Sequence, residues 1–187
     1  MLFRSRQCGV PIGKSPAFDA AMRVVADHAR ATAFLIADGI VPSNEGRGYV
    51  LRRIMRRALR HGKKLGFDGP FLHRVAGVVV EEFREAYPEL AQSASFIDTV
   101  AFQEERRFLE TLDAGLRMVE EEFSRMSGGG NVFPGEVAFK LYDTYGFPAD
   151  LTADLCRERG VALDSAGFEK EMEKQRAQSR EIGRAHV

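Results

Sequence analysis

The chain has 187 residues, 44% of them hydrophobic, which is ordinary for a globular protein. Its 27 Lys and Arg residues balance its 27 Asp and Glu residues. A net charge of zero excludes a general attraction to nucleic acid or to an anionic membrane, so any basic surface must be local. The two cysteines, Cys8 and Cys156, lack metal-binding spacing, and they favour a reducing cytoplasmic compartment over a disulfide.

No apolar run approaches the roughly 20 residues that a membrane-spanning helix needs, and we expect no membrane partner. The terminal segments, residues 1–5 and 181–187, can both be read as translated sequencing adapter, because opposite strands of one adapter string encode them. We therefore expect both segments to be foreign to a natural protein that continues in both directions. The folded regions are then residues 6–126 and 132–180.

The first half of the chain predicts three helices in order. Ser15-Pro16 is typical of a helix start, and Gly39 predicts its end. A turn at residues 42–45 precedes a basic helix over residues 48–64. Residues 71–87 predict a third helix, although the run of valines inside it leaves a buried strand as an alternative.

A longer helix is predicted over residues 98–126. Apolar residues at alternating spacings of three and four form a seam along it, made of Leu109, Leu112, Leu116, Val119, Phe123 and Met126. A glycine-rich linker, residues 127–131, follows and predicts a hinge. Three shorter helices come next: one from Pro134 to residue 145, one capped by Asp150, and one opened by Asp164 or Ser165. The fold class is therefore all-α, with a long central helix and a smaller helical part after the linker.

The basic helix predicts a two-sided arrangement. At about 100° per residue, seven cations fall within an arc of about 140°, and apolar residues fill the other half. We expect the apolar face to enter a core and the cations to face solvent. Three interpretations stay open: phosphate binding, an anionic membrane surface, or cover by acidic side chains from residues 81–89 and 104–122.

The sequence contains no catalytic arrangement that we would propose. The four histidines, His28, His61, His73 and His186, lie near no nucleophile motif, and the glycines have no phosphate-loop spacing. We expect no catalytic residue and no metal ligand in this chain.

Two long strings nevertheless point to a family. Residues 24–62, VVADHARATAFLIADGIVPSNEGRGYVLRRIMRRALRHG, and residues 137–156, VAFKLYDTYGFPADLTADLC, together resemble alanyl-tRNA synthetase. The resemblance extends over about residues 8–180. It implies the helical tRNA-recognition domain that follows the class II catalytic core and precedes the editing region.

The resemblance also implies site residues. The family attaches alanine to its tRNA, and it identifies that tRNA by a G·U wobble pair in the acceptor stem. The pair is read by an Asn of the PSN turn and an Asp of the LYDTYGFP segment, here Asn44 and Asp143, which should then lie close together. Phosphates of the stem would be bound by the basic residues Arg47, Arg52, Arg53, Arg56, Arg57, Arg60, Lys63 and Lys64.

The missing family motifs limit what this chain is expected to do. The family uses ATP and Mg²⁺ in its catalytic core and zinc in its editing region, but the signature motifs of both are absent here. We expect this chain to recognise tRNA without catalysing the reaction, and to depend on the missing catalytic and editing domains. The alternative is a helical protein-interaction module that uses the apolar seam of residues 98–126.

Overall fold

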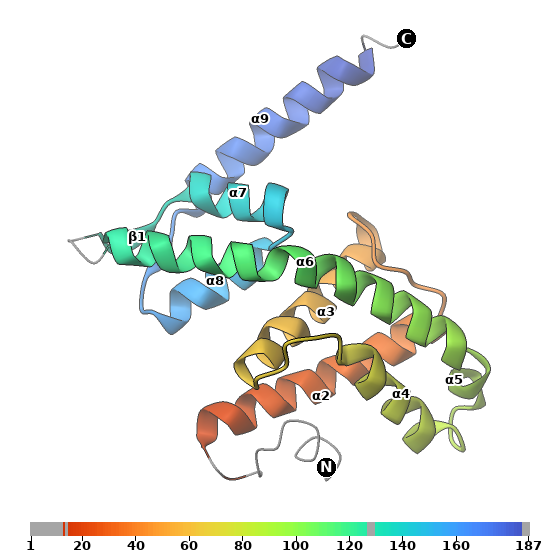
Figure 1. The fold of residues 1–187 in the computed structure, drawn as a ribbon. Coiled ribbons are helices and arrows are strands. Elements are labelled where there is room, and N and C mark those ends of the chain that lie inside the picture. The colour runs from red at the N-terminus through yellow and green to blue at the C-terminus, as the bar shows by residue number, and fades with distance from the viewer. Residues whose placement is uncertain (1–12, 14, 127–129, 185–187) are drawn as a thin grey trace. The chain divides into compact units, whose positions relative to one another are not determined.

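The computed structural model describes residues 13, 15–126 and 130–184, and it is helical almost throughout (Figure 1). The expected all-α class is confirmed, with a 33-residue helix as its longest element. In chain order the elements are α2 (Pro16–Ala37), α3 (Gly46–Lys64), α4 (Leu72–Phe83), α5 (Pro88–Gln92), α6 (Ala94–Met126), β1 (Val132–Phe133), α7 (Gly135–Tyr145), α8 (Ala149–Glu158), β2 (Ala162–Leu163) and α9 (Ser165–Arg184).

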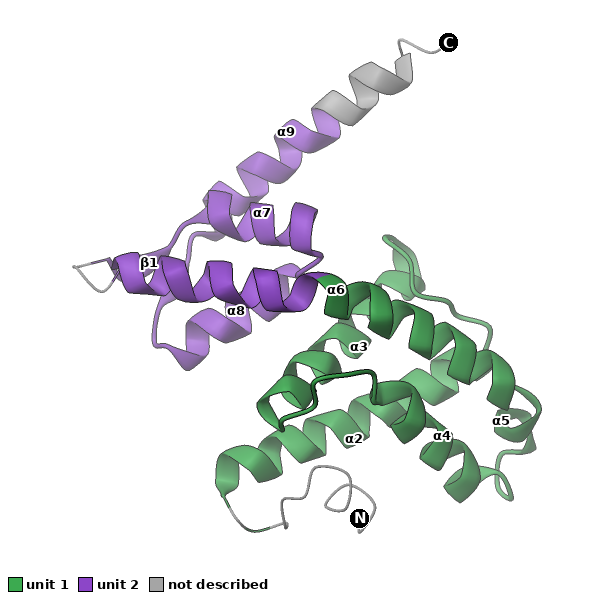
Figure 2. Ribbon diagram, viewed as in Figure 1, with its two compact units in different colours: residues 1–110 green, residues 111–187 purple. Residues whose placement is uncertain are grey.

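The chain forms two compact units, residues 1–110 and residues 111–187, which are coloured separately in Figure 2. The boundary between unit 1 and unit 2 falls within α6. The predicted division at the glycine-rich linker stays a prediction, because residues 127–129 lie outside the described part of the chain.

Unit 1 is built on α2, against which both α3 and α4 pack (Figure 1). The predicted start of α2 is confirmed, since the Ser15 hydroxyl accepts a hydrogen bond from the Phe18 amide at 3.2 Å. Apolar side chains at helical spacing then point into the core, which includes Met22, Val25, Ala29, Ile36, Leu51, Met55, Leu59, Leu72 and Val80. Burial of these side chains holds the three helices together.

The region after α3 differs in detail from the prediction. The valine run lies in helix α4, so the strand alternative is wrong. The single helix expected over residues 71–87 ends at Phe83, and a short helix, α5, begins at Pro88. Proline disfavours helical conformation in the residue before it, which explains the break at Tyr87. Helix α6 then begins four residues earlier than expected, at Ala94.

The partly buried His28 is expected to make the stability of unit 1 depend on pH. Burial lowers its pKa from the usual value of 6.5, and Arg57 adds to this effect, whereas Asp27 opposes it. A lowered pKa means that the unfolded chain takes up the proton first, so the free energy of unfolding should fall as the pH falls below about 6.5. We expect His28→Gln to reduce this slope in urea unfolding measured across that range. An unchanged slope in the variant would show that other groups cause the pH dependence.

Unit 2 contains a feature that the sequence did not predict, a two-residue parallel pairing of β1 with β2. Backbone hydrogen bonds from the Ala162 and Asp164 amides, each 3.0 Å long, make this pairing. Two predicted helix boundaries are confirmed: α7 ends at Tyr145, followed by Gly146 in the left-handed conformation with φ 68°, and α9 starts at Ser165. The predicted cap at Asp150 is wrong, because Pro148 occupies the cap position of α8 and Asp150 lies in its first turn.

The apolar seam of α6 belongs to the packed interior. Leu112, Val119 and Phe123 are buried, and the other three seam residues are partly buried. The Phe123 ring packs edge-to-face on Phe133 of β1, with 5.3 Å between ring centres. A helical interaction module would expose this stripe, so the structure does not favour that alternative.

Candidate nucleic-acid interface

The turn at residues 42–45 is held tightly against the start of α3. The Ser43 hydroxyl donates to the Glu45 carbonyl at 2.8 Å and accepts from the Glu45 amide at 3.5 Å. Gly48 makes this approach possible, because a Cβ there would lie 2.2 Å from Ser43 Oγ and 2.4 Å from the Val41 carbonyl oxygen. The result is a fixed turn on which the Asn44 side chain is exposed.

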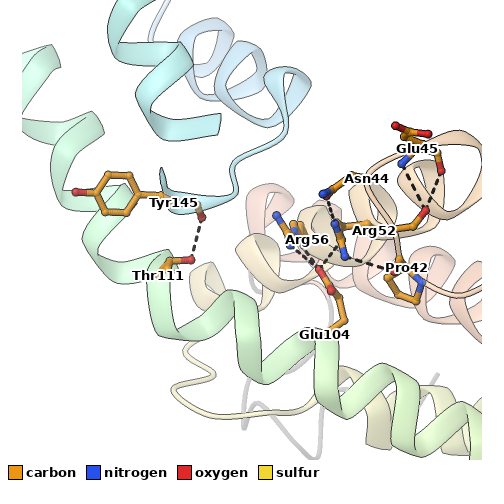
Figure 3. Close-up of polar contacts among 9 residues, drawn as sticks. Pro42, Asn44, Glu45, Arg52, Arg56, Glu104, Thr111 and Tyr145 are labelled. Atoms are coloured by element: carbon orange, nitrogen blue, oxygen red, sulfur yellow. Dashed lines mark hydrogen bonds and ion pairs between the residues drawn. The ribbon is translucent and has the colours of Figure 1, made fainter. Parts of the chain in front are cut away.

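Arg52 of α3 connects this turn to α6 (Figure 3). Its guanidinium donates one hydrogen bond to Asn44 Oδ1 and another to the Pro42 carbonyl, the second at 3.3 Å. Its Nε lies 3.1 Å from Glu104 Oε1. A single side chain therefore joins a backbone carbonyl, an exposed amide and a buried carboxylate.

The cationic face of α3 is less open than the helical wheel predicts. Arg56 and Arg60 are only 9% and 2% exposed, so the expected exposure to solvent is wrong for these two residues. Arg56 donates to Glu104 Oε1 from Nε at 2.9 Å and from Nη2 at 2.6 Å. Burial lowers the pKa of Arg56, and the Glu104 carboxylate raises it again. Acidic side chains of residues 104–122 are one of the predicted covers for the basic face of α3. Glu104 covers Arg52 and Arg56 in this way.

The other predicted phosphate-binding residues differ in exposure. Arg47 and Lys64, at the two ends of α3, are exposed. Lys63 is partly buried and lies 3.4 Å from Asp68. Arg53 and Arg57 are also partly buried. The structure therefore offers Arg47 and Lys64 most directly to a dissolved polyanion, and the phosphate-binding role of the whole set stays a prediction.

Asp143 lies exposed on α7 in unit 2. It accepts a hydrogen bond from the side-chain amide of Gln175 on α9. The segment after it is anchored to α6, since Thr111 Oγ1 donates to the Tyr145 carbonyl at 2.9 Å (Figure 3). Asn44 belongs to unit 1 and Asp143 to unit 2, so their expected proximity also stays a prediction.

Two buried carboxylates of α6 were missed from the sequence. Glu104 contacts Arg52 and Arg56 of α3, and Glu105 accepts hydrogen bonds from the backbone amides of Phe71 and Leu72 at 2.6 and 2.7 Å. Both lie in phase with the buried residues Ile97, Ala101, Phe108 and Leu112. An acid at a position where the apolar spacing predicts a core residue is the signal that would have identified them.

The described residues give little basis for cysteine or metal chemistry. Cys156 is buried, and burial raises the pKa of its thiol to about 11, so the unreactive protonated form prevails at neutral pH. Within residues 13, 15–126 and 130–184, no group of three His, Cys, Asp or Glu side chains gathers as a metal site requires. In the same part of the chain, no helix is long and apolar enough to cross a membrane.

Comparison with known proteins places the chain in a family. Residues 3–186 match the family described as "tRNA synthetases class II (A)", so the chain belongs to the class II tRNA synthetases. The alanine–tRNA ligase of Desulfosudis oleivorans is 54% identical over 175 residues, which are 93% of this chain and 20% of the relative. That of Bordetella parapertussis is 57% identical over 166 residues, 89% of this chain and 19% of the relative. The chain thus spans about a fifth of the length of these relatives.

Proposed function

We propose that this chain is the tRNA-recognition part of a longer alanine–tRNA ligase and that it binds the acceptor stem of the alanine tRNA. Its family membership and the names of its relatives support this assignment. One structural observation carries it: an exposed Asn44 is held on a rigid turn at the start of a helix rich in arginine and lysine.

Two side chains would read the G·U pair in the minor groove. A carboxylate accepts hydrogen bonds only, so Asp143 is suited to the 2-amino group of guanine. Gln175 donates to its Oδ1, which leaves Oδ2 for the base. Asn44 would contact the uracil side of the pair. The minor groove of A-form RNA is wide and shallow, so short side chains on a turn and a helix can reach the base edges.

Phosphate contacts would add affinity without reading sequence. Arg47 and Lys64 are the exposed cations of the predicted set, at the two ends of α3. Binding should therefore weaken as salt rises. The slope should be modest, because Arg52 and Arg56 are engaged with Glu104 inside unit 1.

The reaction itself belongs to the longer protein under this proposal. A cytoplasmic ligase would activate alanine with ATP and Mg²⁺ and would edit mistakes at a zinc-containing site, using domains other than this one. The chain should therefore bind alanine tRNA without charging it. Aminoacylation by the purified chain would contradict this division of roles.

The base readout is tested by Asn44→Ala and Asp143→Asn. Each variant should lose about 1–3 kcal/mol of preference for a G·U acceptor-stem hairpin over a G·C hairpin. The measurement is the ratio of the two dissociation constants at one salt concentration. Glu45→Gln and Thr144→Ala, at exposed neighbouring positions, are the matched controls and should keep the ratio. Equal weakening for both hairpins would contradict specific readout by Asn44 or Asp143.

A further inference from the structure

Arg52 donates a hydrogen bond to Asn44 Oδ1 and so fixes the orientation of the Asn44 side-chain amide. We infer that Arg52 is a positioning residue for base-pair readout, and that it makes Asn44 a hydrogen-bond donor toward RNA. This inference rests on the proposed function, and it differs from the phosphate-binding role that the sequence predicts for Arg52.

Three oxygen atoms lie around the Arg52 guanidinium within unit 1 (Figure 3). Asn44 Oδ1 and the Pro42 carbonyl, the latter at 3.3 Å, accept hydrogen bonds from it, and Glu104 Oε1 forms an ion pair with its Nε at 3.1 Å. The Arg52 side chain is 13% exposed and that of Glu104 only 4%, so the guanidinium is anchored on a buried carboxylate. A planar guanidinium presents its donors at fixed angles, which a lysine ammonium does not.

The orientation of Asn44 follows from this arrangement. An amide side chain carries its acceptor on one atom and its two donors on the other. Because Oδ1 faces Arg52, the exposed part of the side chain presents Nδ2 and its two hydrogens. Asn44 therefore complements acceptors of the minor groove, such as uracil O2, whereas the Asp143 carboxylate complements donors.

Arg52 itself has little capacity left for a phosphate. Its side chain is largely buried, and its charge faces the Glu104 carboxylate. Arg47 is exposed and lies in the first turn of the same helix, which makes it the natural comparison for an arginine that contacts phosphate directly. The two roles predict different responses to salt.

The first experiment compares Arg52→Gln, Arg52→Lys and Arg47→Gln in the full chain, with G·U and G·C hairpins at several salt concentrations. Both Arg52 variants should lower the G·U preference about tenfold and leave the salt slope unchanged. Arg47→Gln should weaken both hairpins equally and reduce the slope by about 1. Full discrimination in Arg52→Lys, or a reduced slope in Arg52→Gln, would overturn the positioning role.

A fourth variant, Asn44→Asp, tests the donor role even if the Arg52 variants fold poorly. Asn44→Asp keeps an acceptor for Arg52 but has no N–H group, so it should keep its thermal unfolding temperature and lose the G·U preference. Retention of the preference would overturn the assignment of Asn44 as a donor. The ratio of the two affinities is the readout, since the added negative charge weakens binding to both hairpins alike.

Nuclear magnetic resonance separates this inference from the proposed function without any RNA. The Asn44 side chain should occupy one χ1 rotamer in the unmodified chain and average among rotamers in Arg52→Gln. Averaging in the unmodified chain would overturn the positioning role even if the G·U preference exists. A single rotamer without any G·U preference would instead contradict the proposed function and leave the geometry standing.

Discussion

Replacing Glu104 with alanine is expected to destabilise unit 1 by about 3–5 kcal/mol. The carboxylate is 4% exposed and faces two guanidiniums, those of Arg52 and Arg56. Its removal leaves a buried cation without its charge partner, which costs more than the intact pair contributes. Amide hydrogen exchange in α3 should accelerate, while exchange in α7 of unit 2 serves as the internal reference.

Two further variants test whether the loss of stability comes from the unpaired buried charge. Glu110→Ala removes an exposed acid of α6 that lies 3.8 Å from Arg106, and it should change stability by less than about 0.5 kcal/mol. Changing Arg52 and Arg56 to Met and Glu104 to Leu together should recover much of the stability lost in Glu104→Ala, because no buried charge is then left uncompensated. Equal exchange rates in Glu104→Ala and Glu110→Ala would contradict the account.

Replacing Glu105 with alanine is expected to cost about 3 kcal/mol and to loosen the start of α4. Glu105 Oε1 accepts from the Phe71 and Leu72 amides at 2.6 and 2.7 Å. Its Oε2 lies 3.3 Å from the His73 amide and 2.9 Å from its Nδ1. These amides lie at the N-terminal end of α4 and have no hydrogen-bond partner within the helix. The negative charge of the carboxylate is also stabilised by the positive end of the helix dipole.

The effect should be confined to one helix end. Exchange of the Phe71, Leu72 and His73 amides should accelerate more than exchange in the middle of α4. Glu105→Gln keeps one acceptor oxygen and should lose about half as much stability. Unchanged protection of the three amides in Glu105→Ala would show that the carboxylate does not cap the helix.

Local patterns predicted the helices well, because their causes are local. Ser15 caps α2, Gly146 ends α7, and the apolar spacing places Leu51, Met55 and Leu59 in the core. These features depend on residues within one or two turns of each other. The β1–β2 pairing joins segments 30 residues apart and is only two residues long. Strands this short show no alternation of apolar and polar residues from which they could be predicted.

The polar contacts of the candidate site could not be predicted in the same way. Helix α6 carries many acids, and nothing in its local sequence says which of them meet α3 or α4. Glu104 contacts Arg56, which lies 48 residues away in the sequence. Glu105 contacts Phe71, which lies 34 residues away. The helical wheel grouped Arg52 and Arg56 with the cations that face solvent, because it contains no information about the helix that covers them.

These buried contacts connect the fold to the proposed readout. Glu104 holds Arg52, Arg52 holds Asn44, and Gly48 allows the turn to lie close to α3. Arg52 and Arg56 of α3 thus support the packing of unit 1. Asn44 and Arg47 are exposed, and under the proposed function they would contact RNA.

The central claim is that this chain distinguishes a G·U pair from a G·C pair in an acceptor stem. The most direct measurement is the ratio of its dissociation constants for two hairpins that differ only at that pair, at constant salt. We predict tighter binding to the G·U hairpin by at least about tenfold, as expected for one or more base-edge hydrogen bonds. Equal affinity for the two hairpins would contradict the claim.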